Sequence, residues 1–334
     1  MSKSPKKKSK LKMFLTLFLI FIVAIVVGLF LYAKEKLGMM NYQELNKSEL
    51  GITENLYENI DTNITKSEFD KILTVVLFGT DFKEEGNASN RSDSIMIASV
   101  NPNTQSVKLL SIPRDTYVSI KGYGKTKINH AYAYGKEQLS IRTINENFGL
   151  NIDKFVTIDF SGLIEIINSM GGVEVEISKE EMNYINYELD HRNDLGDNPN
   201  KTKLSDFGVV TLNGEQALMH SRNRTTGGND FIRANRQRDV LEGIMKKIST
   251  MPKTRILSLV DSIFKNISTN IKPEEYIGIL SSVFPDINKY TNNIISKQIP
   301  SSTYSQDKYI NGVYYYSTDF EQAKKEFYEY IFNK

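Results

Sequence analysis

The sequence predicts an α/β fold: an α/β sandwich with a central mixed sheet flanked by helices, preceded by one transmembrane helix. From Ile72 onward, short apolar runs rich in β-branched residues alternate with stretches of helical periodicity, and turn clusters separate them. These two observations predict the sheet and its helices. A third, an uncharged apolar run near the N-terminus, predicts the membrane helix.

The apolar run Met13–Ala33 has 21 residues without a charge. At about 1.5 Å per residue it spans about 30 Å, the thickness of the hydrocarbon core of a bilayer. A cleavable signal peptide is the alternative, but its apolar core would be about 7–15 residues long and would end in a small-residue cleavage site. Here the run leads directly into Lys34-Glu35-Lys36, which favours a retained anchor.

Six lysines and no acidic residue precede the anchor. The positive-inside rule therefore predicts that residues 1–12 form a cytoplasmic basic tail and that the rest of the chain is exported. The chain has 42 basic and 40 acidic residues, so without those six lysines 36 basic residues face 40 acidic ones, a net charge of −4. An exported, net-acidic region argues against nucleic acid as a partner. No cysteine is present, so the exported part is expected to fold without disulfides.

Residues 34–70 are polar and lack strong periodicity. They are expected to form an extracytoplasmic stalk, with a short helix around Tyr42–Leu50, and residues 71–334 are expected to form the extracellular folded domain. The first strand is expected at Ile72–Gly79, followed by a hairpin of Ser94–Val100 and Val107–Ile112. The later elements are expected as strands at Phe155–Phe160, Val173–Ile177 and Val313–Tyr316, and as helices at Glu137–Phe148, Ser161–Met170, Asn213–Ser221, Asp230–Ile248, Ile256–Ile267, Pro273–Phe284 and Asp319–Phe332.

Charged residues lie at the ends of the first three expected strands. Asp81 follows the first strand, and Arg91 and Asp93 precede the second. If these two strands are antiparallel, the three residues share one end of the sheet, and the next strand brings Arg114 and Asp115 back to that end. Strand topology alone therefore predicts that carboxylates and arginines converge there.

The longest helical pattern brings a second group of residues to the same region. Arg233 and Gln237 are four residues apart and share a helix face. The same face continues as an apolar stripe of Val240, Leu241, Ile244 and Ile248. We therefore expect this face to point into the protein and Arg233 to be buried. Asp230 is expected to be the N-cap, and the positive end of the helix dipole is expected to face the site.

Arg222 and Arg224 add further positive charge where the preceding short helix ends. Arginines that converge on one pocket repel each other unless an anion compensates, and their planar forks suit phosphate oxygens. Asp81 and Asp93 are the oxygen ligands that Mg²⁺ takes together with substrate phosphates, and Mn²⁺ is the alternative metal. This set fits a pyrophosphate better than a single phosphate, and it indicates phosphoryl transfer.

Simpler interpretations exist for each part alone. An isolated Arg–Asp pair is more often a surface salt bridge, and Asp230 alone is more often a helix cap. The three histidines are scattered in the sequence, which makes a zinc site improbable, and the acidic stretch Asp190–Asp197 is expected to be a solvated loop. Tyr132, Tyr134 and Tyr314–Tyr316 either belong to the core or line a groove for sugar, and both interpretations stay open.

The charged residues lie in segments that resemble the LytR-CpsA-Psr family of cell-wall polymer ligases. The resemblance covers about 160 residues, in the family's order, and the single N-terminal membrane helix also fits it. The matching segments are Leu77-Phe-Gly-Thr-Asp81, Arg91-Ser-Asp93-Ser, Leu110-Ser-Ile-Pro-Arg114-Asp115-Thr-Tyr, Lys127-Ile-Asn129, Gly171-Gly-Val-Glu-Val, Leu212-Asn-Gly-Glu-Gln-Ala217, Ser221-Arg222-Asn-Arg224 and Asp230-Phe-Ile-Arg233-Ala-Asn-Arg236-Gln237.

The resemblance implies a membrane-anchored extracellular phosphotransferase of a Gram-positive type cell wall. Such enzymes move a phosphoglycosyl polymer from an undecaprenyl-pyrophosphate carrier to peptidoglycan, at the 6-hydroxyl of a muramic acid residue. The polymer could be teichoic acid, capsule or another wall glycan. A hydrolase that uses water at the same site, and a non-catalytic scaffold that binds the lipid-linked polymer, remain alternatives.

The resemblance also implies roles for individual residues. Asp81 and Asp93 match the Mg²⁺-associated acids, and Asp230 matches an acid that orients arginines or assists catalysis. The residues implied in catalysis are Arg91, Asp93, Arg114 and Asp230. Those implied in binding the substrate are Arg91, Arg114, Lys127, Arg222, Arg224, Arg233 and Gln237. The chain departs from the family's pattern where Gln237 is followed by Arg238, not by a second glutamine, and where residues 225–229 are glycine-rich.

Overall fold

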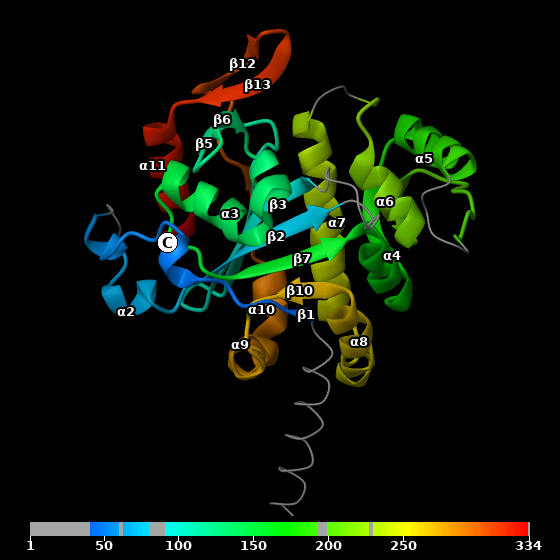
Figure 1. Ribbon diagram of the computed structural model, residues 1–334. Helices are drawn as coiled ribbons and strands as arrows, with labels where there is room; N and C mark the ends of the chain where they lie inside the picture. The colour runs from blue at the N-terminus through cyan, green and yellow to red at the C-terminus, as the bar shows by residue number, and fades with distance from the viewer. Residues whose placement is uncertain (1–40, 60–62, 81–90, 193–198, 227–229, 333–334) are drawn as a thin grey trace, which may run out of the picture.

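The computed structural model describes residues 41–59, 63–80, 91–192, 199–226 and 230–332. Within these residues the central sheet has seven strands, in the order β1-β10-β7-β2-β3-β4-β11 (Figure 1). In that order the strands are Asn41–Tyr42, Ile267–Thr269, Phe155–Asp159, Leu73–Thr80, Ser92–Asn101, Ser106–Ser111 and Ile294–Gln298. The sheet is mixed, because β2 pairs with β7 in parallel and with β3 antiparallel.

Three two-stranded sheets surround this central one. They pair β5 with β6, β8 with β9 and β12 with β13, and the strands are Tyr117–Ile120, Gly124–Lys127, Val173–Ile177, Gly208–Leu212, Ser305–Ile310 and Val313–Thr318. The α-helices α2 to α11 are Lys66–Phe69, His130–Phe148, Phe160–Ser169, Lys179–His191, Gly214–Arg222, Asp230–Thr250, Lys253–Lys265, Pro273–Val283, Ile287–Thr291 and Phe320–Phe332. Short 3₁₀ turns lie at Lys47–Glu49, Leu56–Asn59 and Phe284–Asp286.

Helices cover both faces of the central sheet (Figure 1). Side chains alternate along β2, so Val76 and Phe78 enter the core beneath α3 and α11, while Leu77 and Gly79 face α4 and α7. The core on the α3 side is the largest, with Phe148 of α3 and Phe327 of α11 completely buried. The α/β sandwich with a central mixed sheet and flanking helices is therefore confirmed, and the site lies at the end of the sheet where β2 and β4 end and β3 begins.

The expected strands and helices around the site are confirmed. β2 and β3 pair antiparallel, and β3 and β4 form the hairpin. Below Arg233 the apolar stripe of α7 points inward: Val240 is 2% exposed, and Ile244 packs against two of the buried clusters.

The expected helix over Tyr42–Leu50 is wrong. This segment contains only β1, which adds to the edge of the central sheet, and a 3₁₀ turn at Lys47–Glu49. The described part of the expected stalk packs on the domain, because Leu50, Leu56 and Ile64 are buried in the main core. Apolar side chains at irregular spacing can be buried without a helix, which is why periodicity alone missed this contribution.

Sequence reasoning also missed helix α5. Its N-terminus carries a capping box, in which Ser178 and Glu181 satisfy each other's backbone N–H groups, and Ile185 and Leu189 are completely buried. The expected solvated loop at 190–197 therefore begins within the last turn of a helix. A Ser-x-x-Glu capping signal before a sparse apolar stripe could have identified α5.

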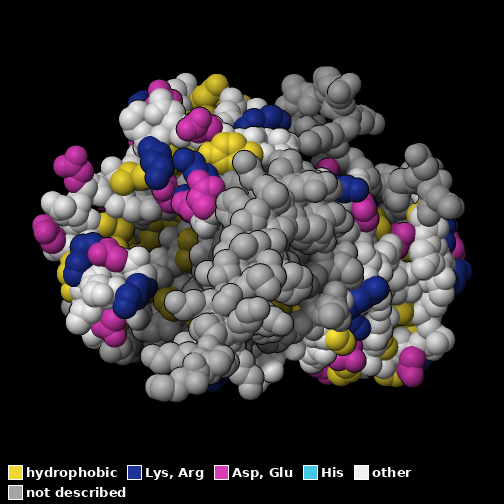
Figure 2. Space-filling model, turned by 90° about the horizontal axis from the view of Figure 1, so that it is seen from below, with side chains coloured by type: hydrophobic (Ala, Val, Ile, Leu, Met, Phe, Trp, Pro, Cys, Tyr) yellow, Lys and Arg dark blue, Asp and Glu magenta, His cyan; other side chains and the backbone are white. Residues whose placement is uncertain are grey.

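The expected cytoplasmic tail and membrane anchor lie outside the described residues. Among the helices that the structure does describe, none is both long enough and apolar enough to cross a bilayer. Figure 2 views the molecule from the end that lies at the bottom of Figure 1, where α8, α9 and β1 are found. On the coloured part of that face, acidic and basic side chains are interspersed, an arrangement typical of a solvated surface.

Candidate active site

The centre of the site is an ion pair between two neighbouring strand ends. Arg114, which follows β4, donates from Nη1 to Oδ1 of Asp93 on β3 at 2.6 Å. Both side chains are about one-fifth exposed, so the pair is reachable from solvent but largely shielded. The predicted convergence of the strand ends is confirmed for these two residues.

The electrostatic environment keeps the Asp93 carboxylate charged. Burial raises its pKa, but the charges of Arg114, Arg233 and Arg224 and the hydrogen bond from Arg114 outweigh burial, so the pKa lies below its ordinary value of 3.8. A carboxylate with a lowered pKa stays ionised, so it is a weak proton acceptor and keeps the charge that a cation ligand needs. This favours a positioning or metal-binding role for Asp93 over proton removal.

Asp115 links Arg114 to Lys127. Its Oδ2 lies 3.4 Å from Nε of Arg114, and its Oδ1 lies 2.5 Å from Nζ of Lys127 at the end of β6. Asp115 is 5% exposed, so the carboxylate is buried between two cations. Its arrival at this end of the sheet was expected from strand order, but the sequence assigned it no role. Its role here is to orient the arginine.

Helix α7 contributes a buried arginine from the opposite side of the same strand end. Arg233 is 5% exposed, which confirms that it is not a solvated surface charge. Its Nη2 donates to the backbone carbonyl of Asp93 at 3.2 Å. The helix begins at Asp230, as expected, but the placement of the Asp230 side chain lies outside what the structure describes.

An apolar cavity of about 80 Å³ opens beside these charges, between the β2–β3 face and helices α4 and α7. Leu77, Met96 and Leu163 are among the side chains that line it, and Gln237 and Ser221 supply polar groups. Arg222 lies at this polar side, because its guanidinium sits 4.8 Å from the centre of the Phe160 ring, which also lines the cavity. The site therefore joins the arginine centre to an apolar slot.

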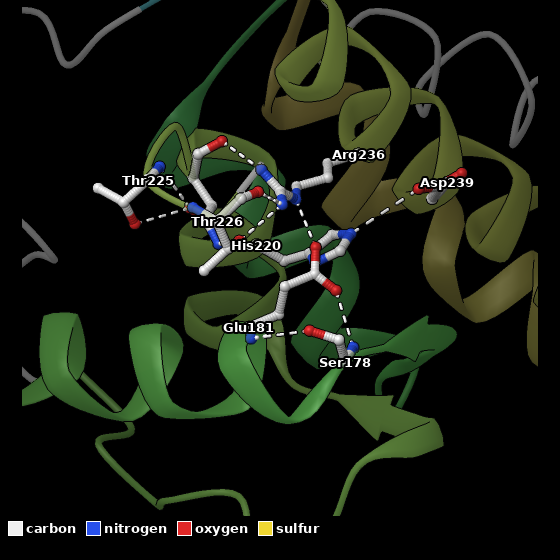
Figure 3. Close-up of polar contacts among 8 residues, drawn as sticks. Ser178, Glu181, His220, Thr225, Thr226, Arg236 and Asp239 are labelled. Carbon is white, nitrogen blue, oxygen red and sulfur yellow. Dashed lines mark hydrogen bonds and ion pairs between the residues drawn. The ribbon is translucent and has the colours of Figure 1, made fainter. Parts of the chain in front are cut away.

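Arg236 holds in place the loop that follows α6 and carries Arg224 (Figure 3). Arg236 is buried, and its Nε lies 2.5 Å from Oε1 of Glu181 on α5. It also donates to the carbonyl oxygens of Asn223 and Thr226 and to the Thr226 hydroxyl. Asn223 turns the same loop, since its Oδ1 accepts from the backbone N–H groups of two following residues. All of these contacts are internal, so Arg236 supports the site and does not face a ligand.

Arg238, which stands where the family's pattern has a second glutamine, points away from the centre. It is 8% exposed and donates to the Ser111 hydroxyl on β4 and to the side chain of Asn235. This departure leaves Arg233 and Gln237 in the expected positions. Of the glycine-rich stretch, residues 227–229 lie outside the description.

The remaining expected residues are less closely joined to the centre. Arg91 and Arg224 are exposed at its margin. The pKa of His130 is lowered, first by burial and then by the charges of Arg91 and Lys127, which places all three in one electrostatic environment. Asp81 lies outside the described residues. The structure therefore brings Arg114 and Arg233 into direct contact with Asp93. Lys127 is linked to this group through Asp115.

The residues present fit a divalent cation bound together with a phosphate ligand. No cluster of three or more acidic, histidine or cysteine ligands occurs in the part of the chain that is described. Mg²⁺, however, commonly takes only one or two carboxylates, and substrate phosphates complete its shell. Asp93, ionised and partly exposed, can supply one such carboxylate.

This fold and this site define an α/β protein with a centre of buried and half-buried arginines next to an apolar slot. The chain belongs to the LytR-CpsA-Psr family, because the model described as the LytR_cpsA_psr family matches residues 35–330.

Curated relatives and solved structures agree with this membership. The chain is 29% identical to a polyisoprenyl-teichoic acid–peptidoglycan teichoic acid transferase TagU of Bacillus licheniformis, covering 95% of this chain and 94% of that protein. It is 31% identical to the protein of the same name from Enterococcus faecalis, covering 91% and 93%. Among solved structures, the LytR-CPS2A-psr family protein YwtF (TagT) with bound octaprenyl pyrophosphate lipid has a TM-score of 0.58 and 26% identity, covering 78% of this chain and 90% of that one.

Proposed function

We propose that this protein transfers a phosphoglycosyl polymer from an undecaprenyl-pyrophosphate carrier to peptidoglycan. The observation that carries the proposal is the junction of the arginine centre with the apolar slot, an arrangement that suits a diphosphate head and the first part of a prenyl tail. The relatives named as teichoic acid transferases and the TagT structure with octaprenyl pyrophosphate support it. Teichoic acid is the polymer that the relatives' names favour, with capsule and other wall glycans as alternatives.

Arg114 and Arg233 bind the pyrophosphate and stabilise the charge that grows on the leaving polyprenyl phosphate. Preorganised arginine forks act strongly here because the surrounding buried groups exclude water. The acceptor hydroxyl forms a bond to the polymer-side phosphorus, while the bond from that phosphorus to the bridging oxygen breaks. The electron pair leaves with the polyprenyl phosphate, and the hydroxyl proton passes to solvent or to a base.

Asp93 would hold Mg²⁺ or Mn²⁺, with Asp81 as the second expected ligand. When bound, such an ion adds positive charge at the phosphate oxygens. The chain's own contribution is to keep Asp93 ionised and fixed by Arg114, and to hold Arg114 through Asp115 and Lys127. Metal binding is measured by titrating Mn²⁺ into wild type and Asp93→Asn and following its electron spin resonance signal.

The slot between α4 and α7 would receive the first part of the prenyl tail. Its volume of about 80 Å³ is small for a prenyl chain, so binding would require α4 and α7 to move apart or most of the tail to lie outside. An anchor at 13–33 would hold the domain on the extracellular side of the membrane, where the carrier lipid lies. The segment 34–40, with the packed residues that follow, would then set the height of the site.

Two alternative functions use the same site. A hydrolase would release the polymer phosphate to water, and a scaffold would bind the lipid without turnover. Full-length protein in detergent, given lipid-linked polymer and Mg²⁺ with and without peptidoglycan oligomers, separates all three. Transfer predicts a polymer–peptidoglycan product only with acceptor. Equal release of polymer phosphate with and without acceptor would instead indicate hydrolysis, and binding without product would indicate a scaffold.

Arg114→Ala should lower the transfer rate by about 100-fold, the magnitude typical of one lost charge-stabilising group. Arg142→Ala is the matched control, because Arg142 lies on α3, where it pairs with Glu146 and donates to the Glu49 carbonyl, and none of these groups belongs to the arginine centre. Equal rates for the two variants would refute the assignment of Arg114.

A further inference from the structure

The segment 116–136, which follows the arginine turn, is both basic and aromatic. It contains four tyrosines, four lysines and one histidine, and no acidic residue. It forms β5, β6 and the first turns of α3, on the side of the central sheet opposite the apolar slot. Such a composition on an exposed hairpin suits a ligand that has both ring faces and negative charge.

Two tyrosines of this segment stack on each other at the surface. The rings of Tyr123 and Tyr134 have centroids 4.2 Å apart and are inclined by only 11°. They are 54% and 43% exposed, so the stack is open to solvent. Gly122 and Gly124 flank Tyr123 with φ values of +82° and +75°, a conformation that places it at the tip of the β5–β6 hairpin. A rigid aromatic pair of this kind offers a flat apolar face with hydroxyl groups at its edge.

The tyrosine stack is connected to the arginine centre. His130 makes an edge-on contact with Tyr134 at 5.9 Å between ring centroids, and its Nδ1 lies 2.9 Å from the Thr126 hydroxyl. Lys127, the next residue along β6, pairs with Asp115 at the centre. A chain of contacts along β6 and the start of α3 thus connects the stack to the centre.

The position of the stack fits the acceptor of the transfer better than the donor. In phosphoryl transfer the attacking and leaving oxygens lie roughly in line, on opposite sides of the phosphorus. The prenyl slot is lined by Leu77, Gly79 and Met96, which face α4 and α7, whereas the stack belongs to the layer of α3 on the other face. A nucleophile that approaches from the α3 side therefore arrives opposite the leaving lipid.

We propose that Tyr123 and Tyr134 form a docking platform for the acceptor glycan strand. Sugar rings of the strand stack on the tyrosine faces, and the carboxylates of its peptide stems pair with the exposed Lys121 and Lys125 of the same hairpin. The proposal rests on the proposed function, since it assigns the acceptor of that reaction. The platform positions the acceptor and takes no part in bond making.

The test compares Tyr123→Ala and Tyr134→Ala with Tyr187→Ala in the full-length protein. Tyr187 is a matched control because it is 58% exposed and stacks on His191 at 4.0 Å, but it lies on α5. With soluble peptidoglycan oligomers as acceptor, both platform variants should raise the KM for acceptor at least tenfold. The KM for the lipid donor and the kcat at saturating acceptor should stay at the wild-type values, and Tyr123→Phe should restore the acceptor KM.

An unchanged acceptor KM in both platform variants would overturn the proposal. A rise in the donor KM instead would also overturn it, because the platform would then hold the donor polymer. If wild type forms no product with any acceptor, the proposed function fails and the platform is judged by binding alone. In that case, nuclear magnetic resonance titration with the same oligomers should show binding to wild type and to Tyr187→Ala but not to Tyr123→Ala. Equal binding by all three proteins would refute the platform.

Discussion

Arg236 provides a sharp test of how the site is built. The structure makes it a positioning residue that ties the loop at 223–226 to Glu181, so replacing it should affect stability and donor binding together. Arg236→Ala leaves the Glu181 carboxylate, whose side chain is 14% exposed, without its guanidinium partner. Breaking a buried ion pair in this way typically costs about 3–5 kcal/mol.

Two backbone carbonyls, of Asn223 and Thr226, also lose their donor. Since these losses share one network they do not add fully, and we expect Arg236→Ala to lower the free energy of unfolding by about 4 kcal/mol. Arg142→Ala, which removes an i,i+4 pair at 2.8 Å and one hydrogen bond to the Glu49 carbonyl, should cost about 1–2 kcal/mol. The loss of stability in Arg236→Lys should lie between the losses in these two variants, because the single ammonium group of lysine cannot make all the hydrogen bonds of the planar guanidinium.

Urea unfolding of the full-length protein in detergent, with far-ultraviolet circular dichroism as the signal, measures these free energies. Binding of a soluble prenyl pyrophosphate is measured in parallel under conditions where each variant is folded. The loosened loop should weaken that binding by at least about tenfold, or 1.4 kcal/mol. If Arg236→Ala is as stable as Arg142→Ala, the ion-pair account is wrong; if stability falls but affinity does not, the loop-positioning account is wrong.

Three further predictions concern the centre, the slot and the anchor. Because the folded pKa of Asp93 is lowered, its charge stabilises the protein above pH 3.8 and this contribution is lost as pH falls through the folded value. The stability difference between wild type and Asp93→Asn should accordingly be constant from pH 6 to 8 and shrink below about pH 4; a difference that changes between pH 6 and 8 would contradict this. Leu163→Trp should fill the slot and weaken the binding of prenyl pyrophosphate at least about tenfold, while the affinity for inorganic pyrophosphate stays unchanged. Because the chain has no other tryptophan, the fluorescence of this one reports on the slot directly. An unchanged affinity for prenyl pyrophosphate would place the tail elsewhere. Removing residues 1–33 should move the protein from the membrane fraction to the soluble fraction of cells, and retention would argue against the anchor.

The part of the site that could be predicted from the sequence is the part set by strand order. Asp93 and Arg114 lie at the ends of apolar strands whose pairing follows from a short turn. The contact between the two side chains could therefore be predicted without knowing the rest of the fold. The burial of Arg233 was predictable for a similar reason, since it continues the apolar stripe of a single long helix.

Contacts between distant segments could not be predicted in this way. The partner of Arg236 is Glu181, 55 residues away on a helix that the apolar pattern did not indicate. Strands β10 and β11 are short and come from the last third of the chain; β11 is an edge of the sheet, and β10 lies between β1 and β7. Their pairing depends on how α7, α8 and α9 pack. For Tyr134 the sequence left core and groove open, and the structure places it at the surface against Tyr123.

The most direct test of the central claim is the fate of the polymer-side phosphorus. Full-length protein, Mg²⁺, lipid-linked polymer and peptidoglycan oligomers are incubated together, and the products are examined by ³¹P nuclear magnetic resonance. A phosphodiester between polymer and peptidoglycan, formed with an equal amount of polyprenyl monophosphate and absent in Arg114→Ala, is the predicted result. A polymer phosphomonoester as the only new signal, or no new signal, would contradict the claim.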